Sequence, residues 1–296
     1  MASPQTRRRP AGRPQIAASG KLRIGDDWNA ITIIALSQDN PLKAVAEFVE
    51  NSIDAGARNV VVTRGRERGE HFLTISDDGA GVRAGEDGAP DFKYVATHIC
   101  DSIKRQLKAG GARGIQGEFG IGLLSFWTVG EALAMSSSGT DGFVYEMHMR
   151  KGDPGYEVTR RHVLVAEPGT RLKISPLLPG VRQLSGEKIQ WYLASELRER
   201  IRHSGASVKV VDRHARKEFS VEPRQFTGEL LHHLPAPAAA EGDIYFEMYL
   251  NPPDPQNAVG LYRSGTRIMA SLTELEALHH YRGPMAICKA SSMCRS

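Results

Sequence analysis

The sequence predicts an α+β fold that is divided into two units, with a boundary near residue 184. Residues 41–56 begin with Pro, end with Gly and hold good helix formers between them, which is typical of a helix. Between residues 133 and 175, four segments alternate apolar and polar side chains, as half-buried antiparallel strands do. An apolar stripe at helical spacing over residues 189–201 predicts a helix that begins the second unit.

The remaining elements follow from short apolar and β-branched runs that are separated by turn residues. A glycine-rich stretch over residues 79–117 contains one helix-like piece, residues 92–107, and a helix is expected over residues 121–129. The expected strands are Val60–Thr63, Phe72–Ser76, Leu133–Ser136, Phe143–Met149, Val158–Val165 and Arg171–Ser175 in the first unit, and Ser207–Val211, Ile244–Leu250 and Gly260–Tyr262 in the second.

Composition and charge place most of the chain among globular proteins. Of the 296 residues, 41% are hydrophobic and 24% are charged, which argues against wholesale disorder. Residues 1–24 hold six Lys and Arg residues and no acidic residue, so we expect a disordered basic arm there. The rest of the chain holds 32 basic and 34 acidic residues, a net charge of −2, so overall charge does not mark the folded body as a nucleic-acid binder.

Signals for membranes, secretion and metal clusters are missing from the sequence. No apolar run approaches the ~20 residues that cross a bilayer, and residues 1–20 lack the apolar middle of a secretory signal. The three cysteines, Cys100, Cys288 and Cys294, are too few and too scattered for a disulfide framework or a zinc site. We therefore expect a cytoplasmic protein with no membrane partner.

One side of the predicted helix 41–56 carries residues that suit a ligand site. Glu47, Asn51 and Asp54 lie within about 60° of one another and opposite the apolar side chains, at about 100° per residue. Asn is a poor residue for a helix interior. Glu47 and Asn51 are one turn apart and present two oxygens in one direction, as a hydrated divalent cation requires. A plain amphipathic helix with a solvated face is the alternative.

A second candidate segment is Asp-Asp-Gly-Ala-Gly over residues 77–81, directly after the predicted strand Phe72–Ser76. The segment fixes a carboxylate beside a backbone that turns sharply and allows close approach. A carboxylate can accept the exocyclic N–H of an adenine. A polar β-turn is the alternative interpretation of this segment.

Two glycine-containing segments complete the set. Residues 114–122 hold four glycines before the predicted helix 121–129, and backbone N–H groups at the start of a helix form a natural phosphate cradle. No Gly-Lys-Ser/Thr sequence follows, which excludes a P-loop. Gly169 and Thr170 precede the strand Arg171–Ser175, where a hydroxyl could contact a nucleotide base or its water.

In this order and spacing, the four segments resemble the motifs of the GHKL superfamily of ATP-binding domains. That superfamily includes gyrase-type topoisomerases, the ninety-kilodalton heat-shock chaperone, histidine kinases and MutL, with the MORC ATPases close by. Residues 47–56 are similar to the first motif in its MutL and MORC form. Residues 77–81, 117–122 and 169–170 are similar to the second, third and fourth motifs.

The resemblance implies a two-layer sandwich in which helices cover a mixed, largely antiparallel sheet, the Bergerat-type ATP-binding fold. This domain would occupy residues 25–183, and a smaller transducer-like α/β domain would occupy residues 184–296. In hydrolysing relatives the transducer supplies a basic residue to the γ-phosphate. Arg263 and Arg267 are candidates for it, and a solvated hairpin is the alternative.

The resemblance also implies roles for individual residues, with ATP and Mg²⁺ as cofactors. Glu47 resembles the general base that deprotonates the attacking water, and Asn51 resembles the Mg²⁺ ligand. Asp77 resembles the carboxylate that reads adenine, helped by Gly81 and by Thr170 through water. Residues 82–119 would form the lid, where Lys104 has a solvated helix face as its alternative role. The expected nucleotide contacts are Asn51, Asp54, Asp77, Gly79, Gly81, Lys104, Gly117, Phe119, Gly120, Ile121, Gly122 and Thr170.

The leading functional hypothesis is an ATP-dependent conformational switch, in which Mg-ATP orders the lid and slow hydrolysis resets it. The expected partners are ATP and a second copy of the chain in an ATP-dependent homodimer. One alternative is a nucleotide-sensing module without useful hydrolysis. Another is a DNA-repair or DNA-clamping ATPase of MutL or MORC style, with DNA or a protein client as partner and the arm Arg7–Arg13 on phosphates.

Overall fold

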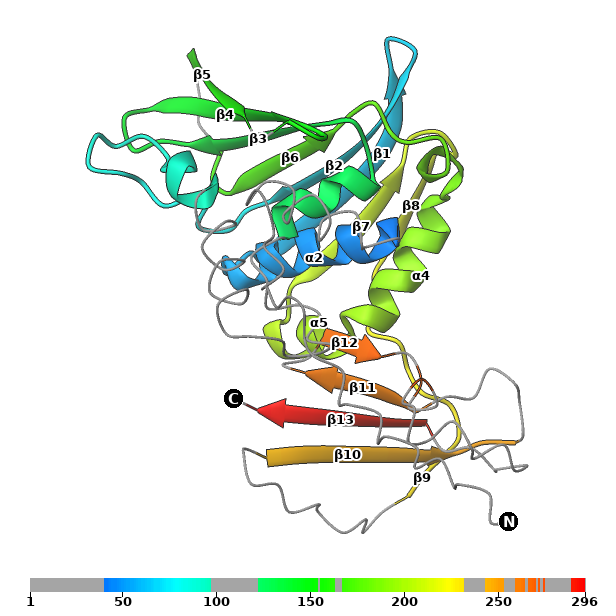
Figure 1. Ribbon diagram of the computed structural model, residues 1–296. Helices are drawn as coiled ribbons and strands as arrows, with labels where there is room; N and C mark the ends of the chain where they lie inside the picture. The colour runs from blue at the N-terminus through cyan, green and yellow to red at the C-terminus, as the bar shows by residue number, and fades with distance from the viewer. Residues whose placement is uncertain are drawn as a thin grey trace, which may run out of the picture.

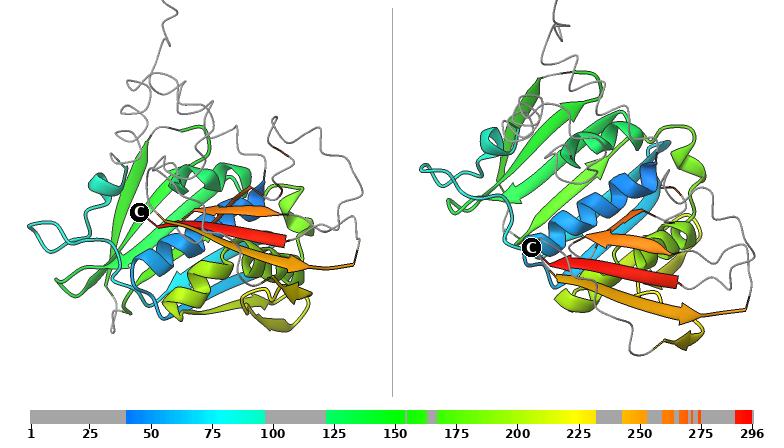
Figure 2. Two further views of the ribbon diagram at one scale, coloured as in Figure 1. Left: turned by 90° about the horizontal axis from the view of Figure 1, so that it is seen from below. Right: turned by 60° about the horizontal axis from the view of Figure 1, so that its bottom comes forward.

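The computed structural model describes residues 40–96, 122–153, 155–162, 167–231, 243–252, 259–263, 266–269, 271, 274 and 289–295. These residues form one eight-stranded sheet with helices on one face, and a separate five-stranded sheet (Figures 1 and 2). The predicted α+β class and the mixed, mostly antiparallel sheet of the Bergerat-type fold are confirmed.

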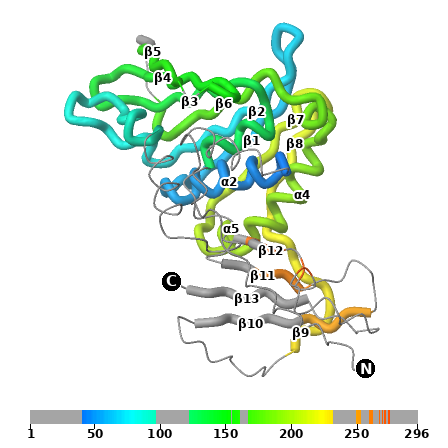
Figure 3. Tube along the Cα trace, viewed as in Figure 1, coloured from blue at the N-terminus to red at the C-terminus, as the bar shows by residue number. Residues whose placement is uncertain are grey.

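The eight-stranded sheet has the order β5-β4-β3-β6-β2-β1-β7-β8. Every neighbouring pair in it is antiparallel except β1 and β7, which run parallel and lie side by side in Figure 3. Its strands are β1 (Asn59–Glu67), β2 (Glu70–Asp77), β3 (Ala132–Ser138), β4 (Phe143–Arg150), β5 (Tyr156–His162), β6 (Thr170–Ile174), β7 (Ser207–Asp212) and β8 (Lys217–Ser220).

The helical layer begins with α2 (Pro41–Asp54). Asn40 caps this helix by accepting a hydrogen bond from the backbone N–H of Leu42 at 3.0 Å, and Pro41 occupies the first turn, where a missing N–H costs nothing. The other helices are η1 (Gly122–Thr128), η2 (Val181–Gln183), α4 (Gly186–Glu196) and α5 (Arg198–Ser204).

The core lies between the two layers. The apolar face of α2 presents Val45, Phe48 and Val49, each at most 1% exposed, and they belong to the same buried cluster as Val62 of β1 and Ile75 of β2. Because this face is fully used for packing, the opposite face of α2, which carries Glu47 and Asn51, is left for other roles.

The second sheet has the order β12-β11-β13-β10-β9. Its edge strand β12 lies against α4 and α5 of the helical layer. Its strands are β9 (Glu229–Leu230), β10 (Asp243–Leu250), β11 (Gly260–Arg263), β12 (Thr266–Met269) and β13 (Lys289–Arg295).

Several elements differ from the sequence-based expectation. The sheet that begins with β1 also contains β7 and β8, so it extends past residue 184, and the change from one sheet to the other falls between β8 and β9. The apolar stripe over residues 189–201 belongs to two helices that are separated at Leu197. The four apolar residues of the stripe are all buried in the core, although no continuous helix joins them: Ile189, Leu193, Leu197 and Ile201.

Other predictions are met in part. The expected helix over residues 121–129 is a 3-10 helix, and the expected helix 92–107 is described only over residues 92–96. The arm at residues 1–24 lies outside the described residues. Within the part of the chain that the structure describes, no helix combines the length and the hydrophobicity needed to span a membrane.

Candidate functional site

The polar face of α2 meets the start of η1. A Cβ atom on Gly122 would lie 3.6 Å from Asn51 Nδ2 and 3.8 Å from Glu47 Oε2. Glu47 is half-buried and Asn51 is exposed. The structure therefore brings together three predicted site residues from the first and third motifs, which are about 70 residues apart in sequence.

Asp77, at the end of β2, is fixed by donors from three different segments. Its Oδ1 atom accepts hydrogen bonds from the backbone N–H of Gly79 at 3.0 Å and from that of Thr170 at 3.1 Å. Its Oδ2 atom accepts one from the Ser52 hydroxyl of α2 at 2.9 Å. These bonds tie the second motif to the first and the fourth, and they hold the carboxylate in one orientation.

The glycines around Asp77 allow this close packing. Gly81 and Gly169 both adopt positive φ, at +73° and +88°. A Cβ on Gly169 would lie 2.0 Å from the Asp77 carbonyl oxygen, and a Cβ on Gly79 would lie 2.9 Å from the Ala55 carbonyl oxygen. Side chains at these positions would therefore push the loop away from β2 and from α2.

The neighbouring carboxylate, Asp78, has a different role. It accepts hydrogen bonds from the backbone N–H groups of Arg58 and Asn59, both at 2.8 Å, and from the Asn59 amide at 2.7 Å. The backbone and side-chain donors of Asn59, followed by the backbone of Arg58, lower the pKa of Asp78. Asp78 thus clamps the turn before β1 and stays ionised.

Asp54 is the last residue of α2 and lies on the same side of the helix as Glu47, about two turns further along. Its carboxylate pairs with the guanidinium of Arg200, in α5. The Nε atom of the same arginine lies 3.4 Å from a Glu50 oxygen.

Five further predicted nucleotide contacts lie outside the described residues: Lys104, Gly117, Phe119, Gly120 and Ile121.

Two serines near the site were missed by the sequence analysis. Ser52 donates to Asp77, and the Ser137 hydroxyl of β3 accepts from the Val82 backbone N–H at 2.9 Å beside Gly81. Ser52 is 4% exposed. A buried serine inside the apolar half of an amphipathic helix is the signal that could have indicated a polar partner for it.

The predicted phosphate sensor Arg267 is already engaged. Its Nε lies 2.9 Å from a carboxylate oxygen of Glu196, in α4, whose side chain is 5% exposed. Burial raises the pKa of Glu196, and Arg267 opposes that rise. Burial and then the charge of Glu196 raise the pKa of Tyr192, to which Glu47 adds a smaller effect. The side chain of Arg263 lies outside the described part of the chain.

The donor set fits a nucleotide with a hydrated divalent cation. Asn51 and Glu47 offer oxygen atoms from adjacent turns of one helix, and the fixed Asp77 carboxylate offers an acceptor to an exocyclic amine. No group of three or more His, Cys, Asp and Glu side chains comes together among the described residues. Among the described residues, Asn51 is the predicted ligand of such a cation.

Comparisons with known proteins agree with this geometry. Residues 40–151 match the family described as histidine kinase-, DNA gyrase B- and HSP90-like ATPases. The chain is similar to the DNA mismatch repair protein MutL of Desulforudis audaxviator strain MP104C, with 30% identity over 157 residues. It is also similar to the MutL proteins of Allorhizobium ampelinum strain ATCC BAA-846, with 32% identity over 143 residues, and Anaplasma phagocytophilum strain HZ, with 37% over 78.

These matches are partial on both sides. They cover 49%, 46% and 26% of this chain, but only 27%, 22% and 12% of the respective MutL proteins. The matched family region contains the first three motifs together with β1 to β4. Residues 40–151 therefore match the ATPase domain of the GHKL superfamily, and this region has MutL-like character.

Proposed function

We propose that the chain binds Mg-ATP and hydrolyses it slowly, and that the bound nucleotide drives lid closure and self-association. The observation that supports this proposal best is the Asp77 carboxylate, which is held by Ser52 of α2, Gly79 and Thr170. Helix α2 also carries Glu47 and Asn51, which meet Gly122, so this one helix contacts residues from the other three motifs.

Each residue has a role in the proposed reaction. Asp77 accepts the exocyclic N–H of adenine, with Thr170 and Gly81 beside it. Asn51 holds Mg²⁺, which neutralises charge on the phosphate oxygens when it is bound. Glu47 orients a water molecule and takes its proton as the water attacks the γ-phosphate. Glu47 is half-buried, so its carboxylate is partly shielded from bulk water.

The experiment that tests this proposal compares Glu47→Gln with Glu50→Gln. Both residues lie on α2, but Glu50 faces Arg200 instead of Gly122. We expect Glu47→Gln to lower ATP turnover by about 10²- to 10⁴-fold without weakening ATP binding, because a positioned base contributes about that much. Glu50→Gln should leave turnover near that of the natural chain. Unchanged turnover in Glu47→Gln would show that Glu47 is not the base, and ATP binding by the natural chain without turnover above background would favour the nucleotide-sensing module without useful hydrolysis.

A second candidate function, a DNA-handling ATPase, is favoured by a local concentration of arginines. Four exposed arginines surround the β1–β2 hairpin, and none of them forms an ion pair with an acidic side chain within the described ranges. We call them the hairpin arginine patch: Arg66, Arg68, Arg182 and Arg213.

The positive field of this patch acts on a neighbouring histidine. Desolvation first, and then the charges of Arg66 and Arg182, lower the pKa of His71. Guanidinium groups match phosphate geometry well, and a local concentration of them is typical of surfaces that bind nucleic-acid backbones. The relatives are DNA mismatch repair proteins, which agrees with this candidate.

A further inference from the structure

Most of the hydrogen-bonding capacity of the Asp77 carboxylate is used by the protein itself. A carboxylate accepts about four hydrogen bonds, about two at each oxygen. Oδ1 accepts from the backbone N–H groups of Gly79 and Thr170, and these two bonds fill its capacity. Among the described residues, Oδ2 accepts from the Ser52 hydroxyl alone. The acceptor site that is left for a ligand therefore belongs to Oδ2.

Ser52 is fixed at the oxygen that carries this remaining site. It lies within α2 and is 4% exposed. Its Oγ atom lies 2.9 Å from Asp77 Oδ2 and 3.2 Å from the carbonyl oxygen of Phe48, one helical turn earlier. The hydroxyl has one proton to donate, and the charged carboxylate is the stronger of the two acceptors. Ser52 therefore donates mainly to Asp77.

A donor on one side of Oδ2 determines the direction in which the oxygen accepts a second bond. Hydrogen bonds to an sp² oxygen lie near its plane, roughly along the lone-pair directions. With Ser52 on one lone pair, the other has a defined direction. Without Ser52, the carboxylate would be held through Oδ1 alone, and Oδ2 would offer two open sites instead of one.

We propose that Ser52 is a positioning residue for base recognition, which acts through Asp77 Oδ2 to give the site its preference for purine nucleotides that carry an exocyclic amine. This inference rests on the proposed function, because it requires Asp77 to read the base. Ser52 directly follows Asn51, so the helix that carries the proposed Mg²⁺ ligand also orients the carboxylate that reads the base.

The test is isothermal titration of the full chain with two nucleotides, each with Mg²⁺. One is ATP, and the other is purine riboside triphosphate, which has hydrogen in place of the exocyclic amine. Ser52→Ala removes the donor, and Ser52→Thr keeps a hydroxyl on the same carbon. The quantity of interest is the ratio of the two affinities within each variant. Circular dichroism checks that each variant folds.

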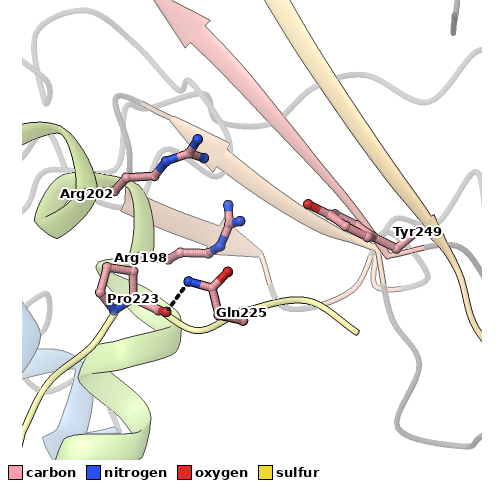
Figure 4. A pocket seen from close by; sticks show the side chains of 5 residues that line it. All are labelled: Arg198, Arg202, Pro223, Gln225 and Tyr249. Atoms are coloured by element: carbon pink, nitrogen blue, oxygen red, sulfur yellow. Dashed lines mark hydrogen bonds between the residues drawn. The ribbon is translucent and has the colours of Figure 1, made fainter. Parts of the chain in front are cut away.

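Ser195 of α4 provides a matched control. It is 2% exposed, and its hydroxyl donates to the Trp191 carbonyl at 3.1 Å, the same bond to the preceding turn that Ser52 makes to Phe48. It also accepts from Arg224 at 3.4 Å, and both chain neighbours of Arg224 line a pocket whose lining residues all lie outside the four motifs (Figure 4). Ser195→Ala thus removes a buried helical hydroxyl outside the motifs.

We expect the natural chain to bind ATP about tenfold or more tighter than purine riboside triphosphate, which is the value of one charged hydrogen bond. Ser52→Ala should weaken ATP binding by about tenfold and leave the affinity for purine riboside triphosphate unchanged, so that the preference for ATP is lost. Ser52→Thr should restore the preference, and Ser195→Ala should retain it.

The inference is overturned if Ser52→Ala keeps the full preference for ATP, or if folded Ser52→Thr loses it as Ser52→Ala does. Equal weakening of both nucleotides in Ser52→Ala also overturns it, because a general structural role would produce that result. These three outcomes leave the proposed function standing. If the natural chain does not bind ATP, or binds both nucleotides equally, the role of Asp77 in the proposed function fails, and this inference fails with it.

Discussion

The two ends of strand β2 differ in chemistry. At its C-terminal end, Asp77 and Asp78 each accept three hydrogen bonds from backbone or side-chain donors. At its N-terminal end, next to Glu70, the residues of the hairpin arginine patch are exposed, and none of them pairs with an acidic side chain within the described ranges. With about 3.3 Å per residue, the strand separates the two by roughly 20 Å.

This difference shows why net charge was a poor guide to the folded body. A net charge of −2 after residue 24 conceals a basic surface at one end of a strand and fixed carboxylates at the other. The same sheet can therefore present a candidate nucleotide site and a candidate polyanion surface without the two interfering, because their fields are separated by more than the Debye length at physiological salt.

The largest effect is expected at the carboxylate end. Asp77→Asn should weaken ATP binding by about a hundredfold or more. The substitution replaces one of the two carboxylate oxygens, which accept hydrogen bonds, with an NH₂ group, which can only donate and would face the adenine N–H or a backbone N–H. Titration with ATP, with circular dichroism as a check on folding, measures this.

Asp78→Asn is the matched control for this prediction. It should retain ATP affinity and lose stability, because its donors are Arg58 and Asn59 instead of the nucleotide. Normal ATP binding by Asp77→Asn would show that the adenine assignment is wrong.

The largest effect on stability, as distinct from ligand binding, concerns the buried ion pair that joins β1 to β7. Arg64 Nη1 lies 2.6 Å from Asp212 Oδ2, and Asp212 is 1% exposed. Asp212→Asn should reduce the free energy of unfolding by about 3–5 kcal/mol, since it leaves a buried guanidinium without its counter-charge. Urea denaturation measures the change.

Glu218→Gln, which removes the exposed partner of Lys209 on the adjacent strand, should cost only about 0–1 kcal/mol. Equal losses in the two variants would mean that burial does not distinguish these pairs.

The same pair predicts an acid dependence of stability. Burial tends to raise the pKa of Asp212, but the pKa is lowered overall. The groups that lower it are the backbone N–H groups of Ala215 and Gly186, which donate hydrogen bonds, and the charged guanidinium of Arg64. A lowered pKa in the folded state gives stability that is present above the unfolded value of about 3.9 and is lost as the pH falls below it. Urea denaturation between pH 6 and pH 3 should show this loss, and Asp212→Asn should show less of it.

The smallest effect is expected at the hairpin arginine patch. The double variant Arg66→Gln and Arg213→Gln should reduce the slope of log affinity for duplex DNA against log salt by about 2, roughly one for each phosphate that is no longer neutralised. The matched double variant, Arg58→Gln and Arg83→Gln, removes two exposed arginines at the other end of the sheet and should keep the slope. Equal slopes in both variants, or no DNA binding by the natural chain, would remove the DNA-handling candidate.

Much of the first unit could be predicted because its signals are local. Helix 41–56 has a Pro start, a Gly end and one apolar face, and it is confirmed as Pro41–Asp54. Strands β2 and β4 are confirmed close to the expected ranges because their alternation or β-branched content is strong. Helical spacing predicts that Glu47 and Asn51 lie together, but their meeting with Gly122 could be expected only through the family resemblance, because nothing in the local sequence relates Gly122 to them.

The rest depends on long-range contacts. The parallel pairing of β1 with β7 is not encoded in either strand, so the sequence pattern placed β7 in the second unit. The separation of α4 and α5 at Leu197 leaves the apolar periodicity intact and is therefore invisible in it. The engagement of Arg267 by Glu196 joins two residues that are 71 positions apart.

The pairing of β1 with β7 has a consequence for how the chain is made. β1 lies between β2 and β7, and its residue Asn59 pairs with Ser207, about 150 positions later. At about 5–20 residues per second, a ribosome needs roughly 7–30 s to deliver that partner. During this interval the β1 edge of the nascent β1–β2 hairpin stays unpaired, and this strand carries Val60 and Val62. Such an edge can recruit strands from other chains, so the delay makes translation the stage at which this protein is most exposed to aggregation and to capture by chaperones.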